Sequence, residues 1–217
     1  MYQNIATKVL TGEVRLSYAN LTAPRAAQDG GEPKYSVTLL IPKTDTATKA
    51  DIDASMKAAY EDGVSKKWGG ARPQPKVILH DGDGLRPSGL PFGDECKGCW
   101  VLTASSKNKP QVVGIDNIQC ELAPQDVYSG MYARVTINFY AFDRAGNKGV
   151  GCGLGNVMKT KDGEPLSGGA SAVSDFADVG SSVAGQDQPW AQQPQQYAAP
   201  AQPVNGVRIN PITGQPM

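Results

Sequence analysis

The chain has 217 residues, with 40% hydrophobic and 19% charged side chains, and its 21 basic and 21 acidic residues give a formal net charge of zero. No apolar run of about 18 residues is present and the N-terminus has no apolar signal core, so we expect neither a membrane span nor secretion. Only one basic and three acidic residues follow Gly168, so the preceding part carries a small positive excess. This excludes a strongly basic nucleic-acid binder, and any positive field must come from local clustering. A cytoplasmic protein is expected.

Alternating apolar and polar residues predict several short strands, which are separated by turn sequences such as Asp-Gly and Ala-Gly-Asn. In the first of them Val14, Leu16 and Tyr18 share one face. Further strands are expected at 34–41, 77–79, 100–104, 111–113, 118–122 and 131–142.

One helix is predicted between the second and third of these strands. The segment Pro42-Lys43-Thr44-Asp45 closes a strand and offers an N-cap, and helical spacing continues to about Gly63. The apolar stripe indicates a helix that covers a sheet, and it consists of Ile52, Met56, Ala59 and Tyr60. Many short strands and one amphipathic helix predict a mainly β fold, an OB-fold-like antiparallel barrel. Most OB-folds have the helix between strands three and four, whereas here it follows the second predicted strand.

The segment 131–142 alternates strictly over its whole length. Its apolar face, which must be buried, consists of Met131, Ala133, Val135, Ile137, Phe139 and Ala141. The opposite face carries three rings and a guanidinium, from Tyr132, Arg134, Tyr140 and Phe142. Rings interleaved with positive charge can stack unpaired bases and meet phosphates. The alternative is that a second layer of protein covers these rings as part of the core.

Two further segments combine cations with a ring. Lys66, Lys67 and Trp68 follow the predicted helix in a glycine-containing loop that could wrap a nucleic-acid backbone. A solvated helix terminus, where lysines complement the helix dipole, is the alternative. Trp100, Lys107 and Lys109 lie on or beside one strand and its polar loop. Here the alternatives are a core tryptophan and an ordinary exposed turn.

The four cysteines give a weak indication of a metal site. Cys96 and Cys99 form a C-x-x-C pair that could bind zinc together with Cys120 and Cys152. The second pair does not have this spacing, however, and Cys120 lies in an alternating strand and is interpreted as a small core residue. We therefore expect no metal and no other cofactor.

Two glycine-containing segments were considered for chemistry. His80 to Gly84 is interpreted mainly as a turn, because its aspartates flank glycines. A small metal-dependent nuclease would need converging carboxylates, for which the candidates are Asp81, Asp83, Asp94 and Glu95. The glycines at 149–155 lack the Lys-Ser/Thr of a phosphate loop, and they indicate a strand with close backbone approach.

Several segments, in this order along the chain, resemble a known family: LSYANL (16–21), KYSVTLLIPK (34–43), DGD (81–83), TASSKNKPQVV (103–113), SGMYARVTINFYAFDRAGNKGVGCGLGNV (129–157) and DGEPL (162–166). They are similar to phage-encoded single-stranded DNA-binding proteins formerly filed as a domain of unknown function. The resemblance implies an OB-fold core without enzymatic activity, whose DNA surface is bordered by 34–43, 103–113 and 129–142. Family members commonly end in an acidic tip with an aromatic residue. This chain departs from that pattern, because 41 residues follow Asp175-Phe176.

We expect a DNA-binding domain at 1–167 and a disordered tail at 168–217, which is Gly/Ser-rich and then Gln/Pro/Ala-rich. The predicted function is sequence-independent coating of single-stranded DNA during phage replication or recombination, in the host cytoplasm. Replication proteins recruited by the tail are an expected partner, and self-association is left open. The alternatives are the nuclease and a phage structural or adaptor protein. The predicted DNA-binding residues are Tyr132, Arg134, Tyr140, Phe142, Trp68, Trp100, Lys66, Lys67, Lys107 and Lys109.

Overall fold

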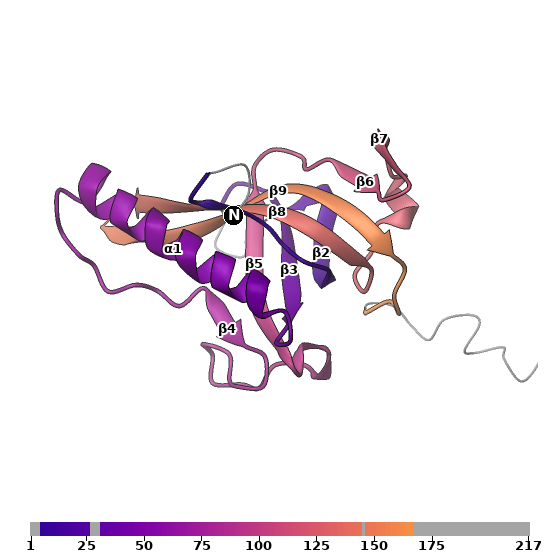
Figure 1. The fold of residues 1–217 in the computed structure, drawn as a ribbon, viewed down its shortest axis with the longest axis horizontal. Coiled ribbons are helices and arrows are strands. Elements are labelled where there is room, and N and C mark those ends of the chain that lie inside the picture. Colours follow the sequence, from indigo (N-terminus) through magenta and orange to yellow (C-terminus); the bar gives the residue numbers. More distant parts are fainter. Residues whose placement is uncertain (1–4, 27–30, 145, 167–217) are drawn as a thin grey trace, which may run out of the picture. The chain divides into compact units, whose positions relative to one another are not determined.

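The structure is a computed structural model that describes residues 5–26, 31–144 and 146–166 (Figure 1). The described chain forms one α-helix, nine strands and two short 3-10 helices: β1 (Lys8–Leu10), β2 (Val14–Arg25), β3 (Lys34–Pro42), α1 (Thr46–Lys66), β4 (Leu79–Asp81), η1 (Asp94–Cys96), β5 (Cys99–Ser106), β6 (Val112–Gly114), β7 (Asn117–Glu121), η2 (Pro124–Asp126), β8 (Tyr132–Arg144) and β9 (Asn147–Lys161). Within the described ranges, α1 is not apolar enough to cross a membrane.

Five of the strands close into a barrel in the order β8, β2, β3, β5, β9 and back to β8. Neighbouring strands are antiparallel except β5 and β9, which run parallel where Ser105 pairs with Gly153. The remaining strands add to the barrel strands: β1 pairs with β8, and β4 pairs with β5. Strand β6 pairs with β9 on one side and with β7 on the other. The predicted mainly β, OB-fold-like barrel with one helix is confirmed.

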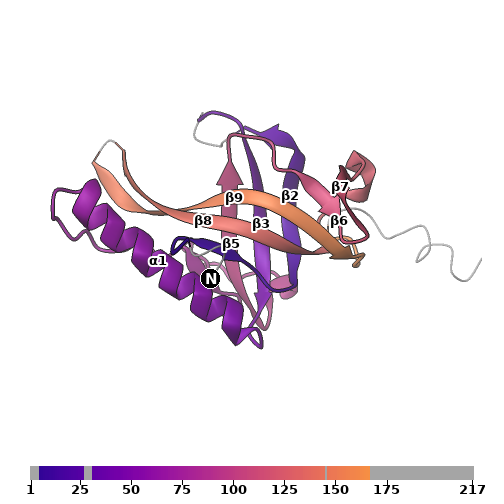
Figure 2. The ribbon, with the colours of Figure 1, turned by 45° about the horizontal axis from the view of Figure 1, so that its top comes forward.

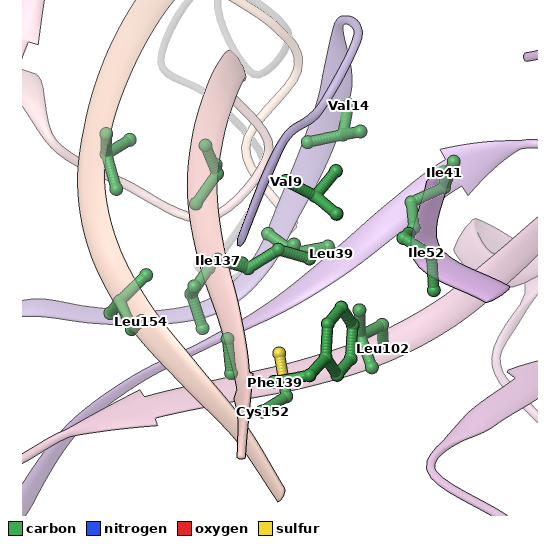
Figure 3. Packing of buried hydrophobic residues seen from close by; sticks show 14 of the residues in the cluster. Val9, Val14, Leu39, Ile41, Ile52, Leu102, Ile137, Phe139, Cys152 and Leu154 are labelled. Atoms are coloured by element: carbon green, nitrogen blue, oxygen red, sulfur yellow. The ribbon is translucent and has the colours of Figure 1, made fainter. Parts of the chain in front are cut away.

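The barrel interior is formed by the alternating apolar face predicted for 131–142. All six of its residues are buried, and Phe139 and Ile137 are at most 1% exposed. Phe139 lies beside Leu102 of β5 and Cys152 of β9 (Figure 3). Leu39 from β3 joins the same cluster, so every barrel strand contributes side chains to one core. Burial of this face fixes the register of β8, because a slip by one residue would move it to solvent.

Helix α1 lies along β8 and β9 where these strands extend beyond the barrel as a long hairpin (Figure 2). The side chain of Asp45 caps the helix by accepting a hydrogen bond of 3.0 Å from the backbone N–H of Thr48. Gly63 permits the closest approach, because a Cβ there would lie 2.6 Å from the Cβ of Ala141. The helix continues to Lys66, one turn beyond its predicted end, and follows the second barrel strand as expected.

Two predictions of burial are wrong. Tyr18, expected on the apolar face with Val14 and Leu16, is 57% exposed. The pairing of β2 with β3 is irregular between Ser17 and Asn20, and Tyr18 has a left-handed φ of 48°, so the strand turns this ring outward. Cys120, expected in the core, is exposed. All five residues of β7 are exposed because β7 pairs only with β6 at the end of the sheet.

Candidate nucleic-acid interface

Tyr140 is the most exposed ring on the outer face of β8, the face that carries Tyr132 to Phe142, and 44% of the residue is accessible to solvent. It pairs across the hairpin with Gly151. A Cβ at Gly151 would lie 2.9 Å from the Cζ atom of the Tyr140 ring, and one at Gly153 would lie 3.5 Å from its Cε1 atom. The ring therefore rests across the bare backbone of β9. Glycine weakens a strand, and an aromatic ring that covers it compensates for part of this cost.

Phe142 repeats the arrangement one step nearer the hairpin end. It pairs with Gly149, where a Cβ would lie 3.1 Å from the ring Cζ. The glycines at 149–155 therefore permit close approach within a strand, as predicted. We call Tyr140 and Phe142, with Gly149 and Gly151 beneath them, the ring platform. Successive side chains of a strand point to opposite faces, so Phe139 and Ala141 lie on the face opposite the ring platform. Helix α1 packs against that opposite face, and the ring platform is therefore not covered by the helix.

The lysines that follow the helix lie beside the ring platform. A cavity of about 250 Å³ is lined by Lys66 and Lys67 from α1 and its C-terminus and by Asn138 and Tyr140 from β8. The Lys67 Nζ donates to the carbonyl of Ala141 (2.9 Å), and the Lys66 Nζ forms an ion pair of 3.0 Å with Asp62. Lys66 and Lys67 are both exposed residues. The exposed ion pair of Lys66 with Asp62 is weak enough to exchange for a phosphate contact. Sequence-predicted residues from two distant segments thus meet at this site.

Trp68 does not join the ring platform. It is 3% exposed, its Nε1 donates to the carbonyl of Phe142 (3.0 Å), and its ring packs edge-on against Tyr60 at 5.2 Å between centroids. The prediction that Trp68 stacks bases is corrected, since no face of a buried ring is accessible to a base. Its role here is to hold the hairpin end on the helix.

Further cations lie near the end of the hairpin. Lys107 forms an ion pair with Glu32, and it is the main cause of the lowered pKa of the Glu32 carboxyl. The charges of Arg144 and Lys34 lower the same pKa to a smaller extent. Arg144 was missed by the sequence analysis. The signal was present, because the alternation of β8 continues past Phe142 and places Arg144 on the outer face.

Tyr132 and Arg134 lie far from the ring platform. Tyr140 is eight positions after Tyr132, which corresponds to about 26 Å along a strand. The Lys161 ammonium lies 4.4 Å and the Arg15 guanidinium 6.0 Å from the centre of the Tyr132 ring. The Nε of Arg134 donates to the carbonyl of Thr11 (3.0 Å). Both side chains are half-buried and have contacts that stabilise barrel closure.

Trp100 and Lys109 are also separate from the ring platform. The half-buried Trp100 ring packs against the core, which agrees with the alternative that it is a core tryptophan. The Nζ atoms of Lys43 and Lys49 lie 5.2 and 4.9 Å from the centre of this ring. The Lys109 Nζ forms an exposed ion pair of 3.0 Å with Glu121 at the edge strand β7. Neither residue contacts the ring platform.

The carboxylates considered for a nuclease have other partners. Asp81 and Asp83 both form ion pairs with Lys43, at 2.6 and 2.7 Å, and this cation lowers the pKa of both carboxyls. The backbone N–H of Asp83 donates to the Asp81 side chain, and residues 82–84 form a turn as predicted, whereas His80 and Asp81 belong to strand β4. Asp94 instead pairs with Lys97 at 2.7 Å.

No cysteine cluster forms either. Burial raises the pKa of the Cys96 thiol to about 11 and that of Cys152 to about 12, whereas Cys120 is exposed on the β7 edge. Among the residues described by the structure, no group of three or more His, Cys, Asp or Glu side chains could hold a metal ion. The four cysteines therefore do not combine into the zinc site that was considered, and the nuclease alternative lacks its converging carboxylates.

A second exposed ring, that of Tyr18, lies on the outer face of the barrel and was also missed. It borders a cavity of about 210 Å³ that is lined by Thr38 and Thr103 from the sheet and by Arg86 and Phe92 from the loop after β4. A non-glycine residue in the left-handed region is uncommon, and such residues concentrate at functional sites. The signal for Tyr18 is this backbone conformation, which alternation alone does not reveal.

Comparison with known proteins places these observations among phage proteins. A family model described as "Enterobacter phage Enc34, ssDNA-binding protein" matches residues 7–187. "Putative protein p50" of Acyrthosiphon pisum secondary endosymbiont phage 1 is 32% identical over 185 residues, which cover 79% of this chain and 94% of that protein.

Solved structures agree with this placement. The single-stranded DNA-binding protein from bacteriophage Enc34 in complex with ssDNA is 30% identical, with a TM-score of 0.64, and the match covers 74% of this chain and 90% of that one. The gp2.5 single-stranded DNA-binding protein of bacteriophage T7 is 16% identical, with a TM-score of 0.51 over 79% of this chain and 93% of that one, which shows a shared fold.

Proposed function

The chain belongs to the family of the single-stranded DNA-binding protein of Enterobacter phage Enc34, and we propose that it binds single-stranded DNA through the ring platform without catalysing a reaction. The observation that carries the proposal is the exposed Tyr140 ring, which lies across the bare strand at Gly151 with Lys66 and Lys67 beside it. A flat, open ring accepts any base, because every base has a π-face. The adjacent ammonium groups supply the phosphate contacts on which affinity depends.

This arrangement supports binding without sequence preference. The cavity beside Tyr140 is lined by two lysines, by Asp62, which is paired with Lys66, and by only two uncharged polar residues, Thr7 and Asn138. Stacking and charge therefore dominate over groups that read base edges. The family supports a role in coating unwound DNA during phage replication or recombination, and such a protein would act in the cytoplasm of the infected cell. Phe142 extends the stacking surface, and Arg144 and Lys107 extend the path of positive charge.

Titration of a fluorescent oligo-dT tests the stacking role of Tyr140. Tyr140→Ala is expected to weaken binding by about 5- to 150-fold, which corresponds to about 1–3 kcal/mol for one stacked base. Tyr140→Phe is the matched control and should bind as the wild type does, because it keeps the ring. Equal affinities for Tyr140→Ala and wild type would remove the ring platform from the binding site. Absence of any oligonucleotide affinity would favour the structural or adaptor alternative.

The role of the lysines is tested by the salt dependence of the same titration. Lys66→Ala and Lys67→Ala should each reduce the slope of log affinity against log salt by about 0.7, the value for one phosphate contact on a single strand. Lys97→Ala, which removes an exposed lysine on the η1 loop that pairs with Asp94, should leave the slope unchanged. Identical slopes in all four proteins would show that these two lysines do not contact phosphate.

Recruitment of replication proteins through 168–217 stays a prediction, as do the disorder of this tail, the domain boundary at 167 and self-association. Residues 167–217 lie outside the described part of the chain. A shortened protein that lacks 168–217 separates DNA binding from partner recruitment. Oligo-dT titration measures the first, and pull-down of phage replication proteins measures the second. DNA binding should persist in the shortened protein, and partner binding should be lost.

A further inference from the structure

A second surface, unrelated to the ring platform, lies between α1 and the segment that leads into β4. It is a groove of about 450 Å³, larger than the two cavities of about 250 and 210 Å³ described above. Its interior is lined mainly by apolar side chains, which come from Met56, Tyr60, Val77, Ile78, Leu79 and Trp100. Val77 is 72% exposed, which is unusual for a side chain of this size in a groove of apolar neighbours. We call this surface the apolar groove.

The wall of the apolar groove is held in place without any ligand. Arg72 forms two hydrogen bonds with the carboxylate of Glu61, at 3.0 and 2.8 Å. The Tyr60 hydroxyl donates to the carbonyl of Pro73 (2.8 Å). These contacts fasten the chain after α1 back onto the helix, so the groove is formed in advance and a ligand need not order it.

The rim of the apolar groove is basic. Lys49, Lys57 and Lys76 border it, and the single acidic residue of its lining, Asp53, forms an ion pair of 2.5 Å with Lys49. Lys49, Asp53 and Lys57 recur every four residues and so lie on one stripe of α1. An apolar interior with an excess of positive charge at its mouth complements a ligand that has apolar side chains between carboxylates.

The lining favours a peptide over a nucleic acid. Aliphatic side chains fill space around other side chains, whereas bases need an open ring face. The two rings of the groove are already engaged: Lys43 and Lys49 lie over Trp100, and Tyr60 packs against Trp68. A base would therefore find no free ring in the apolar groove.

The apolar groove and the ring platform lie on opposite faces of the hairpin. Val150 lines the groove, and the next residue, Gly151, lies under the Tyr140 ring. Successive residues of a strand point to opposite faces. We propose that the apolar groove binds an acidic peptide segment of a partner protein, with an apolar side chain of that segment inserted among Met56, Val77 and Leu79, while the ring platform remains free to bind DNA.

Fluorescence polarisation with a labelled synthetic peptide that alternates aspartate with phenylalanine and leucine tests this proposal. The wild-type protein should bind it saturably, and more weakly when asparagines replace the aspartates. Val77→Asp should weaken peptide binding by about tenfold or more, because it places a carboxylate beside the apolar side chains that receive the peptide. Val77 is largely exposed, so this substitution should not impair folding. Leu90→Asp, at an apolar residue 64% exposed on another loop, is the matched control and should bind normally.

A second measurement separates this proposal from the proposed function. Oligo-dT affinity should be unchanged in Val77→Asp, and peptide binding should be unchanged in Tyr140→Ala. Saturating oligo-dT should not displace the peptide. The proposal is overturned if the wild-type protein does not bind the peptide, or if Leu90→Asp weakens peptide binding as much as Val77→Asp does. It is also overturned if oligo-dT displaces the peptide from the wild-type protein and the Val77→Asp variant binds oligo-dT more weakly than wild type. The last result would assign the apolar groove to nucleic acid.

Discussion

Replacing Gly151 by alanine tests how the Tyr140 ring is held, without removing the ring. The added Cβ would lie 2.9 Å from Cζ, 3.1 Å from Cε2 and 3.1 Å from the hydroxyl oxygen of Tyr140. Ordinary carbon contacts lie at about 3.5–4.0 Å, so the ring must move by about 0.5–1 Å. It can do so, because the ring is nearly half exposed and its far end is the part that collides.

The expected effect is therefore on binding more than on stability. Alanine restrains the unfolded chain by about 0.5–1 kcal/mol relative to glycine, which offsets the lost ring contact. We expect the free energy of unfolding to stay within about 1 kcal/mol of wild type. Oligo-dT affinity should fall by about fivefold, corresponding to about 1 kcal/mol, because the displaced ring stacks less well. Urea denaturation and fluorescence anisotropy measure the two quantities.

A double-mutant cycle with Tyr140→Ala decides whether the effect passes through the ring. In the Tyr140→Ala protein, Gly151→Ala should cause no further loss of affinity and should stabilise the fold by about 0.5–1 kcal/mol, since nothing remains to collide. Gly153→Ala is the control for binding, because its Cβ would lie at an ordinary contact distance of 3.5 Å from the ring. Its Cβ would also lie 3.3 Å from the carbonyl oxygen of Asn138, so the stability of this variant is measured separately. Equal losses of affinity from Gly151→Ala in the presence and absence of the ring would refute the reasoning.

Three further predictions follow from the burial and charges of other residues. Trp68→Ala should destabilise the fold by about 3–5 kcal/mol in urea denaturation, because it empties a buried site, and a loss below 1 kcal/mol would contradict its structural role. Cys120 should react with a maleimide in the native protein while Cys152 reacts only after unfolding, as read by mass spectrometry; equal native reactivity would show that the burial is wrong. The ion pair of Asp83 with Lys43 lowers the pKa of Asp83, so its stabilisation is complete above the ordinary aspartate pKa and is lost as the pH falls through the lowered value. The N–H of Gly98 donates to Asp83, so its protection factor, the exchange rate corrected for the intrinsic rate at each pH, should fall at acidic pH in wild type. In Asp83→Asn this protection factor should show no such change with pH.

Strict alternation was sufficient to predict the inner face of β8, because burial of one face leaves a single register. It also identified Tyr140 and Phe142, whose exposure depends on which face α1 covers. It could not separate Tyr132 from Tyr140. Both rings lie on the same face of one strand. Tyr132 lies where β8 pairs with β2 as well as β9, in the barrel itself, whereas Tyr140 lies in the part of β8 that extends past the barrel and pairs with β9.

Local patterns were less informative where tertiary contacts decide the outcome. The bulge that exposes Tyr18 results from the pairing of β2 with β3, which the β2 sequence alone does not reveal. Trp68 follows two lysines in a glycine-containing loop, as an exposed residue would, yet it is buried because the hairpin lies over it. Cys120 alternates as a core residue would, but no second layer covers β7. The three-residue strand β1 was too short to produce a periodic signal and was not predicted.

The contacts of the hairpin with the end of α1 also bear on how the protein behaves at high concentration. A long strand that leaves its barrel offers unpaired carbonyls to other chains, and such edges promote aggregation. Here the side chain of Lys67 occupies the carbonyl of Ala141, which lies on the edge of β8 away from β9. This lysine thus also acts as a gatekeeper against intermolecular strand addition at the end of the hairpin, and its removal should favour aggregation at high protein concentration.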